Sequence, residues 1–280
     1  MSARWFILSQ TALKGTHLIV LPNREAAEYA SADLYNLVEG DCVFFLPDSG
    51  GAVERSNYKS SLAVQRTSAV GRMMEPGEGV LYIVTYPEAL EEKVPEQKEI
   101  TSALITIRKG EEYNYDQLRE MLGTLGFERV DFVSAPGQYA IRGAVIDIFS
   151  YSLEHPYRLS FFGNEVDRIH TFDCNTQLSV EKVDQADIYP DIVAGGMQEE
   201  GVSILTLLKK DAVVWLDSSD MYKDREFFPE LTEFQHVFLE MPLQKQGAET
   251  ITFSIAPQPV FNKNFELLLS DIRTRLESGY

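Results

Sequence analysis

The stretch PYRLSFFGNEV, residues 156–166, predicts a strand, a two-residue turn and the start of a second strand. Side chains alternate between the two faces of a strand. This alternation gives one face made of Tyr157, Leu159 and Phe161 and an opposite face made of Arg158, Ser160 and Phe162. The first face is typical of a core. The second places a large aromatic side chain beside an arginine, where polar residues would suffice.

Further strand-like runs surround this hairpin, and they predict a small α+β domain of antiparallel hairpins packed with a helix, residues 104–190. The strand-like runs lie at 129–133, 138–150 and 165–172. The helix is expected over 115–125, with Asn114 as its N-terminal cap and an apolar face at helical spacing.

The sequence on both sides of this domain shows a different pattern of secondary structure. Apolar strands at 16–22, 41–48 and 79–86 alternate with helical segments, a pattern typical of a parallel sheet covered on both faces. This pattern returns after residue 190, with strands expected at 211–217 and 250–257. Helices are expected at 202–210, in the second part of 225–241, and from Asn262 or Asn264 to 276. The simplest arrangement is one α/β domain, residues 1–103 and 191–280, interrupted by the central domain.

Composition excludes several classes of function. The 280 residues carry a net charge of −18 with dispersed lysines and arginines, which argues against direct nucleic-acid binding by this chain. No apolar run is long enough for a membrane span and the N-terminus has no signal-peptide pattern, so we expect a cytoplasmic protein. The two cysteines are expected to be reduced. The four histidines are scattered, so no metal site is predicted.

Nucleotide chemistry is also missing from the sequence. A phosphate-binding P-loop ends in Gly-Lys-Ser/Thr, and the chain contains no Gly-Lys dipeptide. The strand VVWLD ends in Asp217, as a Walker B strand does, but Ser218 follows where a carboxylate is usual. The competing interpretation is that Asp217 caps a turn. No catalytic residue and no cofactor are predicted.

Asp147 lies inside the apolar strand AVIDIF and therefore needs a partner. Arg142 or Arg158 from a neighbouring strand could supply it.

The run from 137 to 173 closely resembles the module shared by UvrB and the transcription-repair coupling factors (Mfd). The shared motifs are a Gly-x-Tyr-x-x-Arg-Gly strand, an Asp-Ile-Phe strand end and a Pro-Tyr-Arg-Leu-x-Phe-Phe-Gly-x-Glu hairpin. The resemblance implies a degenerate helicase-like (RecA/P-loop-type) parallel-sheet domain interrupted by the smaller one. The absent P-loop and the short segment 46–60 favour the coupling factors over UvrB, and Asp217 is then a degenerate Walker B residue.

The resemblance also implies a function, which is docking of UvrA in nucleotide excision repair. At matching positions the contact residues are Arg142, Arg158 and Phe162, with Phe161 and Glu165 as weaker neighbours. The chain would be a non-catalytic N-terminal module that recruits UvrA to RNA polymerase stalled at DNA damage. Its parent would be an ATP-dependent DNA translocase that reaches RNA polymerase and DNA through parts beyond residue 280. The alternative is a UvrB-type damage-binding or ATP-hydrolysing helicase fragment.

Overall fold

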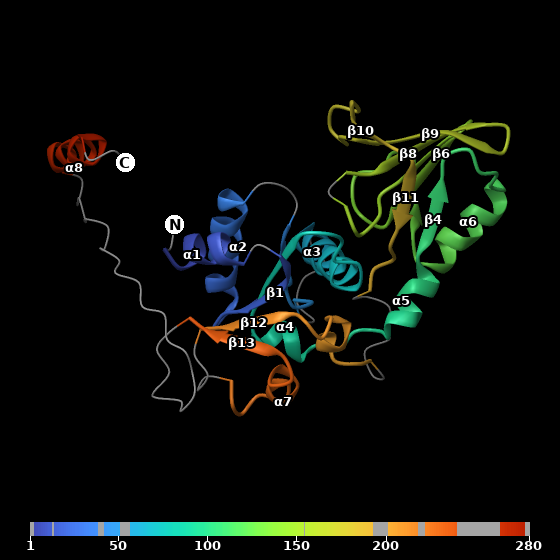
Figure 1. Cartoon of the computed structure of the whole chain (residues 1–280). Coiled ribbons are helices and arrows are strands. Elements are labelled where there is room, and N and C mark those ends of the chain that lie inside the picture. The colour runs from blue at the N-terminus through green and yellow to red at the C-terminus, as the bar shows by residue number, and fades with distance from the viewer. Residues whose placement is uncertain are drawn as a thin grey trace. The chain divides into compact units, whose positions relative to one another are not determined.

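The computed structural model describes residues 3–12, 14–38, 42–50, 57–153, 155–192, 201–217, 222–239 and 264–277. The chain forms two compact units, Met1–Gln244 and Lys245–Tyr280. The first contains a parallel sheet with its helices and a separate set of mainly antiparallel strands (Figure 1). The described part of the second is helix α8, Phe265–Glu277.

A five-stranded parallel sheet forms the α/β part, with the strand order β13-β12-β1-β3-β2. Its strands are β1 Gly15–Val20, β2 Val43–Phe45, β3 Val80–Thr85, β12 Val213–Leu216 and β13 Gln235–Phe238. β12 pairs directly with β1, although about 190 residues of chain separate them, many of them in the other sheets. The predicted fold class, a parallel-sheet domain interrupted by a smaller domain, is therefore confirmed.

Helices cover both faces of this sheet. Along β1, Leu18 and Val20 pack into one apolar cluster, and Ile19 packs into another. The first cluster includes residues of α3, and the second includes residues of α1 and α2. The helical elements of this part are α1 Ala3–Thr11, α2 Arg24–Leu37, α3 Asn57–Met74, α4 Pro87–Glu91, the 3-10 helix η2 Ile204–Leu207 and α7 Phe228–Leu231.

The interrupting part contains a six-stranded sheet with the order β10-β9-β8-β7-β6-β5, and we call it the inserted domain. Its strands are β5 Glu128–Arg129, β6 Gln138–Arg142, β7 Val145–Ile148, β8 Tyr157–Phe162, β9 Glu165–Phe172 and β10 Ser179–Val183. Neighbours are antiparallel except β5 and β6. A two-stranded sheet joins β4 Ile105–Arg108 to β11 Gln185–Ile188. α5 Gln97–Ala103 leads into this domain.

Helix α6, Tyr115–Thr124, packs on the apolar face of the inserted domain through Leu118 and Leu122. Asn114 caps it as predicted, because its side chain accepts hydrogen bonds from the backbone N–H groups of Asp116 and Gln117. Gly126 follows with φ 80°, the left-handed conformation that ends many helices.

Two helix predictions are wrong. The segment 202–210 forms only η2, and the second part of 225–241 contains strand β13 instead of a helix. The short run Gln-His-Val-Phe, 235–238, fits both the helical period and the strand period. Parallel pairing with β12 makes it a strand. The helix near the C-terminus is confirmed, with Asn264 accepting a hydrogen bond from the Leu267 N–H. The strand expected at 250–257 lies outside the described residues.

No helix in the described ranges is long and apolar enough to cross a bilayer. In the same ranges no group of three or more histidine, cysteine or acidic residues could hold a metal ion.

His17 gives the α/β part a pH-dependent stability. It is buried on β1, and its Nδ1 accepts a hydrogen bond from Trp215 Nε1–H (3.0 Å), so Nε2 carries the proton and donates to the Lys14 carbonyl (2.8 Å). Burial lowers the pKa of His17 below its usual 6.5. The unfolded chain therefore binds more protons, and this contribution to stability is complete above pH 6.5 and is lost as the pH falls through the folded-state pKa.

We expect urea unfolding to show a lower free energy of unfolding at pH 5.5 than at pH 7.5, by up to about 1.4 kcal/mol per unit of pKa difference. The drop should shrink in His17→Gln and persist in His236→Gln, because His236 is exposed. An equal drop in all three proteins would rule out His17 as its source.

Candidate protein-docking site

The hairpin of β8 and β9 places Phe162 on the surface. Along β8, Tyr157, Leu159 and Phe161 are buried, Arg158 and Ser160 are half-buried, and Phe162 is 85% exposed. The predicted alternation is thus confirmed. Phe162 pairs with Glu165 across a turn in which Gly163 has φ 63°. A large apolar side chain this exposed is available to another molecule.

Phe161 belongs to the core rather than to this surface. Its ring lies 4.7 Å from that of Tyr115 on α6, and the side chain packs with the apolar cluster under the sheet. Glu165 is exposed at the start of β9, next to Phe162 in the ladder. Of these two predicted neighbours, only Glu165 can be reached from outside the folded domain.

Asp147 is the buried partner of both arginines. It lies on β7 directly opposite Arg158, with 1% of its side chain exposed. Arg158 donates from Nε to Oδ1 (2.7 Å) and from Nη2 to Oδ2 (2.9 Å), which is a two-point contact. Arg142 on β6 donates to the same Oδ2. We call these three residues the arginine–carboxylate cluster.

Each arginine of the cluster also lies over an aromatic ring. The Arg158 guanidinium carbon is 3.9 Å from the centre of the Phe172 ring, and that of Arg142 is 4.8 Å from the Phe132 ring. Such contacts favour a cation above the ring face. The side chains retain 18% and 33% exposure, respectively. The two guanidinium groups are therefore held in place with part of each surface open.

The loop after β9 completes the support of Arg158. Gln177 accepts a hydrogen bond from Arg158 Nη2 (2.8 Å) and donates to the Cys174 carbonyl (2.8 Å). Its φ of 60° is unusual for a residue other than glycine. Asp173 fixes the loop by accepting from the backbone N–H groups of Asn175 and Thr176, and hydrogen bonds to Thr176 and Asn175 lower the pKa of its carboxyl group.

Sequence reasoning missed Phe132 and Gln177. Phe132 is 65% exposed and covers Arg142, yet ten residues separate the two in sequence. Its only sequence signal was an aromatic residue inside a strand-like run. Gln177 gave no signal, because its role depends on the loop conformation.

Asp217 lies at the end of β12, where its carboxylate binds Arg4 Nη1 of α1 (2.7 Å). At the same end of the neighbouring strands, Arg66 is 2% exposed and donates to the carbonyls of Pro47, Ala89 and Glu92. The carboxyl ends of parallel strands are where α/β proteins bind nucleotides. Among the described residues at that edge, Asp217 is paired with Arg4 and Arg66 is bound to three backbone carbonyls.

The comparisons with known proteins give a match for the inserted domain. Residues 105–192 match the model of the UvrB interaction domain family. The wider chain is similar to transcription-repair-coupling factors from many bacteria, so the resemblance inferred from the sequence is confirmed.

Three relatives illustrate this similarity. The Bacillus subtilis (strain 168) protein is 31% identical over 173 residues, which is 61% of this chain and 14% of the relative. The Escherichia coli (strain K12) protein is 38% identical over 86 residues, 31% and 8% of the two chains. The Staphylococcus aureus (strain NCTC 8325 / PS 47) protein is 26% identical over 231 residues, 79% and 20% of the two chains. The matched region thus spans a fifth or less of each relative.

The arginine–carboxylate cluster should dominate the stability of the inserted domain. Asp147→Ala leaves two arginines without their buried counter-charge, so we expect the free energy of unfolding to fall by about 3 kcal/mol or more. Asp167→Ala is the matched control, because Asp167 is an exposed aspartate on β9 that pairs with its neighbour Arg168. It should change stability by less than about 0.5 kcal/mol. Urea unfolding checks both variants, and equal effects would contradict a central role for Asp147.

Proposed function

We propose that this chain is a non-catalytic protein-docking module that recruits UvrA during nucleotide excision repair. The observation that carries the proposal is Phe162, exposed on a UvrB interaction domain on the same strand as a held arginine, Arg158. The docking residues would be Arg142, Arg158 and Phe162, with Glu165 at the edge and Phe161 supporting them from the core. The proposed division of the chain is an α/β domain, 1–103 and 191–280, and a docking domain, 104–190.

Preorganised arginine side chains support this proposal. Arginine and aromatic side chains are enriched among residues that dominate binding energies. Fixing a long side chain on binding costs about 0.5–1.5 kcal/mol. Arg142 and Arg158 are already fixed by Asp147 in the free protein, so binding would not incur this cost for them. Their open surfaces would accept carboxylates of a partner, while the Phe162 ring would fill an apolar pocket. The partner surface expected from this chemistry is acidic with an apolar depression.

We further propose that the parent protein is a transcription-repair coupling factor. In that protein this module would be N-terminal. Other parts would act on RNA polymerase stalled at DNA damage and on DNA, as an ATP-dependent translocase in the cytoplasm. The names of the relatives support this placement. The geometry of the docking residues does not depend on it.

Replacement of Phe162 gives the sharpest test. Phe162→Ala should weaken UvrA binding more than tenfold, about 1.4 kcal/mol, in a calorimetric titration of this chain with UvrA. Stability should hardly change, because the ring is exposed. Tyr29→Ala is the control, since Tyr29 is 70% exposed on α2 in the other domain. Unchanged affinity in Phe162→Ala would place the docking surface elsewhere, and absence of binding by the folded wild-type chain would refute the function.

Nucleotide binding distinguishes the rival helicase or ATP-hydrolysing interpretation. Because Asp217 is paired with Arg4 and the sequence has no Gly-Lys dipeptide for a P-loop, Mg-ATP should leave the unfolding temperature unchanged at millimolar concentration. Ligand at about 100 times its Kd would stabilise the folded state by about 2.7 kcal/mol, which a thermal shift detects readily. A clear shift would favour the rival. A gel shift with damaged DNA at physiological salt tests the UvrB-type alternative, and we expect no binding because the net charge is −18.

A further inference from the structure

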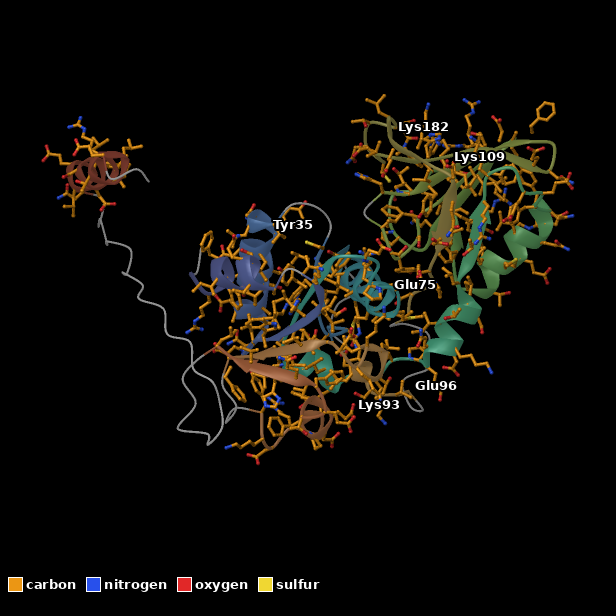
Figure 2. All side chains as sticks on the ribbon, in the orientation of Figure 1. Tyr35, Glu75, Lys93, Glu96, Lys109 and Lys182 are labelled. Carbon is orange, nitrogen blue, oxygen red and sulfur yellow. The ribbon has the colours of Figure 1, made fainter. Side chains whose placement is uncertain are left out.

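A groove of about 850 Å³ lies between the α/β part and the inserted domain, away from Phe162. One wall comes from α2, β2 and α3, and the other from residues 152–189. The walls meet where Ser68 Oγ donates to the Ser152 carbonyl (2.8 Å) and where Gly71 faces the ring of Tyr189. Figure 2 labels Tyr35 on α2 and Glu75 after α3, both of which line the groove.

The edge of β2 opens into this groove. β2 is the last strand of the parallel sheet, and β3 is its neighbour. The Cys42 carbonyl accepts from Tyr82 N–H, and Leu46 N–H donates to the Val84 carbonyl. Alternate residues of a strand bond to opposite sides, so the peptide groups of Val43 and Phe45 point away from β3. No other strand in the described ranges pairs with that side, and an open edge is a template for an added strand.

Acidic side chains outnumber basic ones in the lining of the groove. Glu28, Glu75, Glu181 and Asp187 line it together with Arg72 and His155. Glu28 pairs with Arg24 (2.8 Å), so Glu75, Glu181 and Asp187 supply most of the negative charge. Neither Glu75 nor Glu181 forms an ion pair with the described residues. Burial, together with the negative charge of Glu75 and Asp187, raises the pKa of Tyr189.

Apolar side chains complete the lining of the groove. Tyr35 is 61% exposed and Val180 is 55% exposed, while Phe44 and Leu153 are partly buried.

We propose that this groove binds an extended protein segment rich in lysine or arginine, which adds to the open edge of β2 as a further strand. Main-chain hydrogen bonds to Val43 and Phe45 would give the affinity, and alternate side chains would select the sequence. Basic residues would face Glu75 and Glu181, and apolar residues would contact Tyr35 and Phe44. A second copy of this chain is disfavoured as the occupant because each copy carries a net charge of −18.

This site is independent of the proposed UvrA contact. Tyr157 lines the groove at the start of β8, whereas Phe162 lies at the other end of the same strand. Phe162→Ala should therefore leave the groove functional, and blocking the groove should leave UvrA binding unchanged.

Two synthetic peptides of about eight residues, one alternating valine with lysine and one alternating valine with glutamate, test the proposal. Fluorescence anisotropy should give a Kd at least about tenfold lower for the lysine peptide. Hydrogen exchange should then show slower exchange at the amides of Val43 and Phe45. Equal binding of the two peptides, no binding of either, or no protection at these amides would overturn the proposal.

Matched variants test whether the acidic side chains and the open edge of β2 bind the peptide. Glu75→Gln combined with Glu181→Gln should weaken the lysine peptide about fivefold, whereas Glu226→Gln with Glu233→Gln, exposed and outside the groove, should not. Val43→Pro removes an N–H on the open side while leaving the β3 ladder intact, and it should also weaken binding. Unfolding curves confirm that each variant is folded. If sedimentation shows self-association that protects the same amides without peptide, a second copy is the occupant and the proposal fails.

Discussion

The two-point contact between Asp147 and Arg158 is the interaction on which the inserted domain and its surface both depend. A carboxylate in the interior of a sheet is costly unless charged partners surround it. Asp147 binds Arg158 and Arg142 on the two neighbouring strands, so it fixes the register of three strands as well as two side chains. The buried Phe172 and the exposed residues Phe132 and Gln177 also contact the guanidinium groups. The same contacts that stabilise this sheet therefore also shape the proposed UvrA-docking surface.

Much of the fold could be predicted from the sequence because its strands follow simple periods. Continuous apolar runs such as 16–22 predicted the parallel sheet, and alternation along 157–162 assigned each side chain of β8 to its face. Prediction from the apolar pattern failed where a segment was short. The run 235–238 fits a helix as well as a strand by itself, and only β12 beside it decides the outcome. Pairing between distant segments, such as β1 with β12, depends on tertiary packing that no local pattern encodes.

The candidate site could be predicted only in part. A charged residue in an apolar strand indicated that Asp147 needs a partner, but the sequence left Arg142 and Arg158 as alternatives, and the structure uses both. Phe132 and Gln177 could not be found, because one contact joins a residue beyond the end of β5 to β6 and the other depends on a left-handed residue in a loop. Arg4 as partner of Asp217 was equally invisible, since 213 residues separate the two. The periodicity of apolar residues in the sequence carries no information about side-chain contacts between distant segments.

The most direct test of the central claim is the UvrA affinity of Asp147→Asn, measured by calorimetry beside its unfolding curve. Asparagine keeps the shape of the side chain but removes the charge that holds Arg142 and Arg158. If the arginine–carboxylate cluster preorganises the docking surface, the variant should remain folded at low temperature and bind UvrA about tenfold more weakly. Full affinity in a folded Asp147→Asn protein would contradict the claim, because the arginines would then bind UvrA without their anchor.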